Sequence, residues 1–136
     1  RADELGSPYH RGFQGFEQMA ADVESGAVYS NRSLAFTVGV LLGARTAAAA
    51  YVREISAKYT PQAAKHLVAA ADSYDLEVEQ LGQLAEMFPH QGRPAGDISD
   101  PEVAQQAAAR VRQAYRWEQQ GVESLAQALA AMPTLP

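Results

Sequence analysis

The sequence predicts an all-α protein, a four-helix up-down bundle that forms one domain over residues 1–136. Alanine, the strongest helix former, accounts for 27 of the 136 residues. Apolar residues recur at steps of three and four, as on the buried face of a helix, and no segment alternates with a period of two. Proline and glycine gather in a few clusters, which mark where one helix ends and the next begins.

The first two helices are expected at about residues 8–25 and 33–59, with Asn31 as the alternative start of the second. Ser7 is a favoured N-cap, and it precedes a proline at the first helical position. Gly26 follows the first helix as a stop signal. The second helix has to end before Pro61, because the residue before a proline avoids the helical conformation.

The last two helices are expected at about residues 61–88 and 101–132. Thr60 and Asp100 repeat the pattern of a capping residue followed by proline. At a rise of 1.5 Å per residue, helices 2, 3 and 4 are each roughly 40–48 Å long. Long amphipathic helices with short connections pack most simply as an up-down bundle, and thin alanine-rich cores also suit a homodimer.

Composition and motifs argue against several classes of function. The chain has no cysteine, so it holds no disulfide, thiolate nucleophile or cysteine-ligated metal. A net charge of −5 argues against a nucleic-acid partner, which needs a basic surface. The three histidines form neither an HExxH nor an ExxH motif, and no glycine-rich phosphate loop or GxSxG motif is present. We therefore expect no metal and no cofactor.

We also expect no membrane span. The longest apolar candidate, Leu34–Val52, carries Arg45 in its middle and falls short of the roughly 18 uninterrupted apolar residues that a span needs. A cysteine-free chain suits the cytoplasm, our preferred compartment. It suits a processed exported protein as well, because the sequence begins at Arg1.

Charged residues inside the apolar stripes are the main functional signal. Arg45 lies four residues after Leu41, and Glu118 lies four residues after Ala114, each near the centre of its stripe. Asp75 lies at the edge of the stripe in its own helix. Because a buried charge is costly unless it is paired, we predict an interior ion pair of Arg45 with Glu118, joined by Asp75.

This ion pair has three interpretations. It is a buried salt bridge that fixes helix register, or it lines a cavity and binds a polar ligand, or the side chains reach to the surface along the helices. Tyr74 has two: it belongs to the core, or it lines a pocket for an aromatic ligand. The candidate ligand-binding residues are Arg45, Glu118, Asp75 and Tyr74.

Four segments resemble those of a known family. Gly15–Glu24 resembles a G/A-Y/F-E-x-W/M-x-x-D-L-E segment, and Leu42–Ile55 resembles an L-x-x-A-R-x-A-A-x-x-L-R-E-I helix. Ala64–Tyr74 resembles A-x-x-H-L-x-x-A-A-x-x-Y, and Ala114–Glu123 resembles A-x-x-x-E-x-x-G/A-I-E. In this order they are similar to the helical C-terminal domain of butirosin-biosynthesis-protein-H-like proteins, over nearly the whole chain.

The resemblance implies a limited role. In that family the N-terminal domain resembles a cysteine peptidase and supplies the nucleophile that transfers an acyl group from a carrier protein to an aminoglycoside. This chain has no cysteine, so the resemblance carries no acyl-transfer residue over to it. Met19 also departs from the family pattern, in which a tryptophan is common at this position.

We therefore expect a non-catalytic helical module that binds a small polar or aromatic ligand, or a partner domain, between its helices. One alternative is a small enzyme, or part of one, in which buried Glu118 or Asp75 acts as a general acid/base beside Arg45. Another is a structural dimerisation domain.

Overall fold

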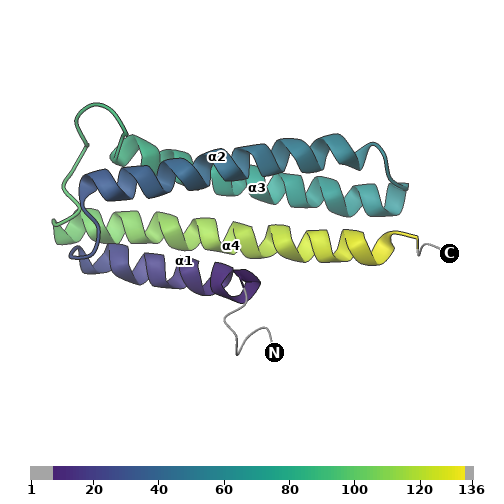
Figure 1. The fold of residues 1–136 in the computed structure, drawn as a ribbon, viewed down its shortest axis with the longest axis horizontal. Helices are drawn as coiled ribbons and strands as arrows, with labels where there is room; N and C mark the ends of the chain where they lie inside the picture. The colour runs from purple at the N-terminus through teal and green to yellow at the C-terminus, as the bar shows by residue number, and fades with distance from the viewer. Residues whose placement is uncertain (1–7, 134–136) are drawn as a thin grey trace.

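The protein is an all-α four-helix bundle. The structure, a computed structural model, describes residues 8–133, with side chains from residue 13 onward. Consecutive helices run in opposite directions, which gives the predicted up-down order (Figure 1). Within residues 8–133 there is no β-strand. The helices are α1 (Pro8–Ser25), α2 (Asn31–Ser56), α3 (Pro61–Met87) and α4 (Pro101–Ala131).

Capping residues set most of the helix boundaries. Thr60 and Asp100 cap α3 and α4 by accepting hydrogen bonds from backbone N–H groups, as predicted. Ser30 and Ser33 form a reciprocal capping box, with both side-chain-to-backbone hydrogen bonds at 3.0 Å. This box starts α2 at Asn31, the earlier of the two expected starts. The predicted cap Ser7 lies outside the described residues.

The helices pack in the order α1–α4–α3–α2, and α1 and α2 do not close the ring. Close backbone packing joins α1 to α4, α4 to α3 and α3 to α2. The backbones of α1 and α2 stay apart, and α1 has 18 residues whereas α4 has 31. Because α1 covers only part of the length of α4, all four helices pack together in one half of the bundle, and α2, α3 and α4 alone form the other half (Figure 1).

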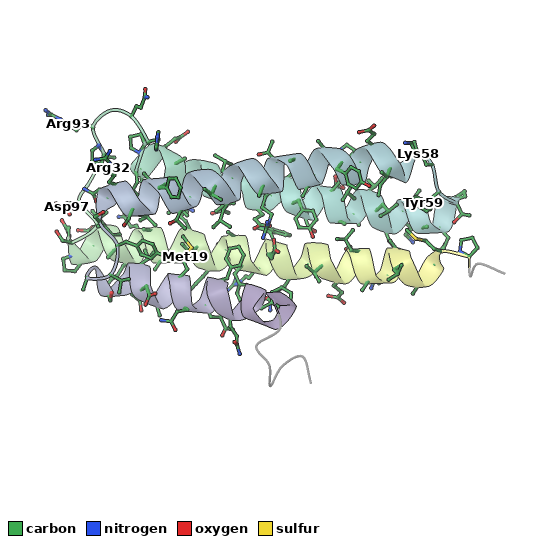
Figure 2. The ribbon with its side chains drawn as sticks, viewed as in Figure 1. Met19, Arg32, Lys58, Tyr59, Arg93 and Asp97 are labelled. Atoms are coloured by element: carbon green, nitrogen blue, oxygen red, sulfur yellow. The ribbon has the colours of Figure 1, made fainter. Side chains whose placement is uncertain are left out.

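The connections hold α1 and α2 at one end of the bundle. Gly26 ends α1 with a φ of +69°, a conformation that favours glycine, and a Cβ there would lie 3.1 Å from the Ile98 carbonyl oxygen. The buried Ile98 donates its N–H to Oδ1 of Asn31 at 2.8 Å. The loop before α4 is thereby tied to the start of α2. Farther along the bundle, Met19 of α1 points into the interior (Figure 2).

α2 is the one helix in residues 8–133 that is long and apolar enough to cross a membrane, judged by length and composition. A single helix of this kind is weak grounds for a span, because core helices of soluble proteins meet the same criterion. Its most apolar 18-residue window is only 22% buried, so much of its apolar surface faces away from the bundle.

Candidate functional site

Arg45 and Glu118 form the predicted interior ion pair. Arg45 reaches from α2 to α4, where its Nε donates to Oε1 of Glu118 at 2.7 Å and its Nη2 donates to Oε2 at 3.1 Å. Two parallel hydrogen bonds between a guanidinium and a carboxylate are a strong, directional pairing. The Arg45 side chain is 25% exposed and the Glu118 side chain is 13% exposed.

Glu77 of α3 is a third member of this cluster. Its side chain is fully buried, and its Oε2 lies 3.4 Å from Nε of Arg45. Neither carboxyl oxygen has a hydrogen-bond partner of good geometry among the described residues. Burial first, and then the neighbouring carboxyl group of Glu118, raises the pKa of Glu77 to about 9, although Arg45 opposes this. At neutral pH, Glu77 is therefore protonated and uncharged.

The charge of Arg45 is retained in this setting. Burial acts to lower the pKa of Arg45, but the hydrogen bonds and charge of Glu118, with a contribution from Glu77, outweigh burial and raise it. With Glu77 protonated, the cluster carries one positive and one negative charge. The three-residue cluster is electrically neutral at pH 7.

Sequence reasoning missed Glu77, although a signal for it was present. It lies three residues after Tyr74 and four before Leu81, so it occupies the apolar stripe of α3. The neighbouring Val78 lies four residues after Tyr74 and fits the same helical spacing, so spacing alone does not separate it from Glu77. The structure buries Glu77 fully and leaves Val78 only half-buried.

The prediction that Asp75 joins Arg45 in the interior is wrong. Asp75 is 56% exposed and pairs with Arg53 of α2, which also contacts Asp72 at 3.2 Å. Consecutive residues on a helix point 100° apart, and the residue before Asp75, Tyr74, points into the core. The Asp75 carboxylate therefore lies at the surface and not at the edge of the stripe. The interior carboxyl groups are therefore those of Glu77 and Glu118.

Tyr74 lies in the core next to the cluster. It is buried against Gly121 of α4, where an added Cβ would meet a ring carbon of Tyr74 at 2.8 Å. Burial and then the charge of Glu118 raise the pKa of Tyr74 to about 12. Tyr74 is not among the residues that line the groove described below, so its placement favours the core interpretation.

The charged cluster divides the apolar core into two parts. The larger part lies in the four-helix half. It includes Leu81, four residues after Glu77 in α3, and Ala114, four residues before Glu118 in α4. The smaller part lies in the three-helix half and includes Ala49 and Tyr74. The cluster thus forms a polar layer across α2, α3 and α4, between the two parts of the core.

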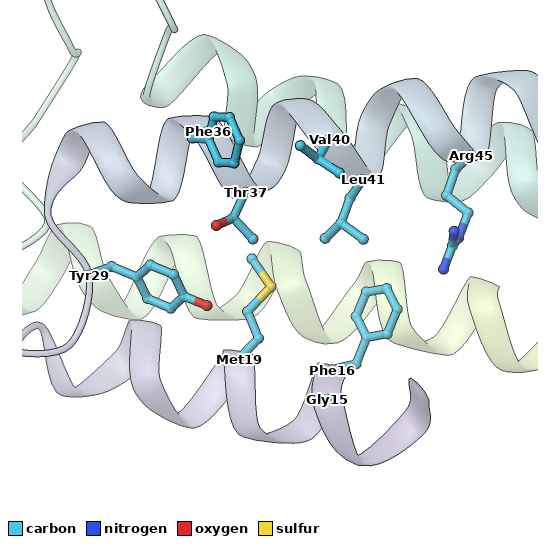
Figure 3. A pocket seen from close by; sticks show the side chains of 9 residues that line it. All are labelled: Gly15, Phe16, Met19, Tyr29, Phe36, Thr37, Val40, Leu41 and Arg45. Atoms are coloured by element: carbon cyan, nitrogen blue, oxygen red, sulfur yellow. The ribbon is translucent and has the colours of Figure 1, made fainter. Parts of the chain in front are cut away.

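A groove of about 450 Å³ runs between α1 and α2, where the two backbones stay apart. Arg45 lies at one end of the groove beside Phe16, and Tyr29 lies at the other end (Figure 3). Most of its other walls are apolar. They include Gly15, Phe16 and Met19 from α1 and Phe36, Val40 and Leu41 from α2.

The described residues offer no cluster of three or more histidine, aspartate or glutamate side chains that could hold a metal ion. The candidate site is therefore an apolar groove that ends at a paired arginine. Comparison of the chain with protein-family models, with curated proteins and with solved structures finds no match in any of the three. The class of this protein is set by its fold, an all-α four-helix bundle.

Proposed function

We propose that this chain is a helical binding module whose groove between α1 and α2 holds a small ligand. The ligand has an aromatic or apolar body and an uncharged hydrogen-bond acceptor. One observation carries the proposal: an open, apolar groove of about 450 Å³ ends at the guanidinium group of Arg45. Ligand pockets typically have this form, with apolar walls and a few polar groups that orient the ligand, in volumes of roughly 300–1,000 Å³.

The groove walls favour an apolar body. Phe16, Met19 and Leu41 present apolar side chains to the groove from both helices. Burying apolar surface against them contributes roughly 25 cal/mol per Å² removed from water. A flat aromatic ring also suits a slot between two helices, because both of its faces find contacts there.

The charge balance at Arg45 favours an uncharged acceptor. Arg45 uses Nε and Nη2 for Glu118, so the Nη1 group lies outside that pair. An anionic ligand would approach the Glu118 carboxylate as well as Arg45, and the two effects oppose each other. A carbonyl, amide or hydroxyl oxygen accepts from Nη1 without that repulsion.

The enzyme alternative has less support. A general acid/base has to come within hydrogen-bond reach of its substrate. Glu77, whose pKa is raised to about 9, has no exposed surface and does not line the groove. Of the two predicted candidates, Glu118 accepts two hydrogen bonds from Arg45, and Asp75 is paired with Arg53 at the surface.

The resemblance to the helical domain of butirosin-biosynthesis-protein-H-like proteins stays a prediction. The groove is compatible with either a small ligand or a helix of a neighbouring domain. The groove's small volume and the arginine at its end favour the small ligand. The compartment that we expect for the protein, the cytoplasm, does not affect this choice between a small ligand and a helix.

A matched set of aromatic probes tests the proposal. Benzamide, benzyl alcohol and benzoate share one ring and differ in the head group. We expect benzamide and benzyl alcohol to shift the amide NMR signals of Met19 and Leu41 and to bind more tightly than benzoate. Saturable shifts confined to other helices, or no shifts at all, would contradict the proposal.

Gly15 offers a matched pair of variants for the same experiment. It lines the groove, and an added Cβ there meets nothing within 4 Å. Gly15→Leu extends a bulky side chain from this open Cβ position at the groove, whereas Gly15→Ala adds only a methyl group. We expect Gly15→Leu to abolish probe binding while the helix content is kept, and Gly15→Ala to keep binding. Equal binding by both variants would place the ligand elsewhere.

A further inference from the structure

The outward face of α2 is apolar and has no partner among the residues that the structure describes. Phe36, Val40 and Tyr51 are 62%, 58% and 63% exposed. Gly43 and Ala47 lie between them on the same face, and a Cβ added at Gly43 would meet nothing within 4 Å. Contiguous exposed apolar surface on a helix marks an interaction site more often than isolated residues do.

The residues on this face follow the spacing of a helix–helix seam. Phe36, Val40, Gly43 and Ala47 recur at steps of four, three and four, the heptad pattern of antiparallel and parallel helix pairs. Arg45, the one charged residue between Ser33 and Val52, points to the interior instead. The seam is therefore uncharged along its whole central part.

The seam is also symmetric about the bond between Gly43 and Ala44. Phe36 and Tyr51 lie equally far from this bond along the chain, and so do Val40 and Ala47. When two copies of α2 run antiparallel about a twofold axis at this bond, Phe36 faces Tyr51 of the second copy. The small residues then meet at the centre, where they allow a close approach of the two helix axes.

The two ends of the seam carry opposite charges that match in the same arrangement. Arg32 lies at the start of α2 and Glu54 near its end, and both are exposed on one flank of the seam. Figure 2 labels Arg32 at the end of the bundle where α2 begins. Neither residue takes part in an ion pair among the described residues. In the antiparallel pair, each Arg32 lies beside Glu54 of the other copy.

We propose that this face of α2 binds a second copy of the chain as an antiparallel, twofold-symmetric dimer centred between Gly43 and Ala44. Self-complementary shape, with aromatic residues outside and small ones inside, and self-complementary charge both favour a second copy over an unrelated partner. Phe36 and Val40 also line the groove, so Tyr51 and Ala47 of the second copy lie near its mouth.

Concentration-dependent mass measurement tests the dimer first. Sedimentation equilibrium from about 1 to about 300 µM covers the affinities expected of an interface of modest size. We expect the wild type to dimerise and Ala47→Glu to raise the dissociation constant at least about tenfold, because it buries a charge opposite Val40. Ala109→Glu, on an exposed position of α4, is the matched control and keeps the dimer. A wild type that is monomeric throughout overturns the proposal.

Cysteine cross-linking tests the antiparallel register. Because the chain has no cysteine, only the introduced cysteines can form a disulfide. Ala44→Cys lies beside the twofold axis and should form a disulfide-linked dimer by itself under mild oxidation. Phe36→Cys and Tyr51→Cys should each form no disulfide-linked dimer alone, because like positions lie roughly 22 Å apart, and should cross-link when mixed. Self-linking of both end variants would indicate a parallel pair and overturn the proposal.

Charge reversal separates this dimer from other occupants of the face. Arg32→Glu and Glu54→Arg should each weaken the dimer, because each places like charges side by side, and the double variant should restore it. Association that ignores these changes overturns the proposal. So does binding to phosphatidylcholine vesicles that Ala47→Glu abolishes in a chain that stays monomeric, since a lipid surface is then what covers the face.

Discussion

The Nε of Arg45 lies 3.4 Å from Oε2 of Glu77 and 2.7 Å from Oε1 of Glu118. Arg45 therefore bonds the two carboxyl groups unequally. Glu118 accepts two hydrogen bonds from the guanidinium group, and Glu77 accepts none. Glu77 is nevertheless the more deeply buried of the two. It follows that removing one glutamate should affect stability in the opposite direction from removing the other.

We predict that Glu77→Leu stabilises the protein and Glu118→Leu destabilises it. Replacing a buried, poorly partnered carboxyl group with an apolar side chain should raise the free energy of unfolding by about 1 kcal/mol. Losing Glu118 leaves Arg45 without its bidentate partner and should cost about 2 kcal/mol. That is less than for a fully buried pair, because Glu77 can then ionise. Urea unfolding at pH 7 measures both, and a larger loss for Glu77→Leu would contradict the ordering.

Glu77 should also make stability depend on pH. Its pKa is raised from about 4.5 in the unfolded chain to about 9 in the folded one, so the folded state binds the extra proton between these values. The free energy of unfolding should therefore fall as pH rises from about 5 to 9, by no more than about 1.4 kcal/mol per pH unit.

Glu77→Gln is the control for this pH dependence, because it keeps the shape of the side chain and cannot titrate. The lowered pKa values of Glu24 and Asp97 act below this window, and the raised pKa of Tyr74, about 12, acts above it. Urea unfolding at several pH values should show a steeper decline for the wild type than for the variant. Parallel curves would mean that Glu77 is ionised in the folded protein at neutral pH.

Gly121 and Gly82 should respond in opposite ways to alanine. Both lie in helices, where glycine costs roughly 0.5–1 kcal/mol relative to alanine. At Gly82 an added Cβ meets nothing within 4 Å, so Gly82→Ala should stabilise by up to about 1 kcal/mol. At Gly121 the Cβ would lie 2.8 Å from the ring of Tyr74, so Gly121→Ala should destabilise by about 1–3 kcal/mol.

Double variants locate the cause of the Gly121 effect. In a Tyr74→Leu background the ring is gone, and Gly121→Ala should then cost clearly less than in the wild type. Thermal unfolding monitored by circular dichroism is sufficient for this cycle. An unchanged cost in that background would assign the effect to the backbone of α4 and not to contact with Tyr74.

Helix positions were predictable from sequence because their signals are local. A capping residue followed by proline sets the start of α3 at Pro61 and of α4 at Pro101, and needs no information from distant residues. The start of α2 was harder to predict. Its cap, Ser30, is bonded reciprocally to another serine, Ser33, and not to the glutamate or glutamine of the usual capping box.

The site was only partly predictable, because it depends on how the helices are rotated and spaced. Placing Arg45 and Glu118 within their stripes was enough to predict that they meet. The stripe of α3 was placed less accurately, so Asp75 was predicted as the third member of the cluster and Glu77 was passed over. The groove could not be predicted in this way, because it arises from the separation of α1 and α2, which no periodicity within one helix encodes.

The hydrogen bond from the Ile98 N–H to Oδ1 of Asn31 should hold the loop before α4 against the start of α2. Ile98 is 2% exposed, so Asn31→Ala leaves its N–H without a partner in a buried place and should cost about 1–2 kcal/mol. Asn31→Asp keeps an acceptor at the same position and adds a negative charge in the first turn of α2, where the helix dipole favours it. The aspartate variant should therefore match or exceed the wild type in stability. Amide exchange of Ile98 gives a local readout: it should accelerate in Asn31→Ala and not in Asn31→Asp. Equal exchange in both variants would show that packing of the Ile98 side chain, and not this hydrogen bond, holds the loop.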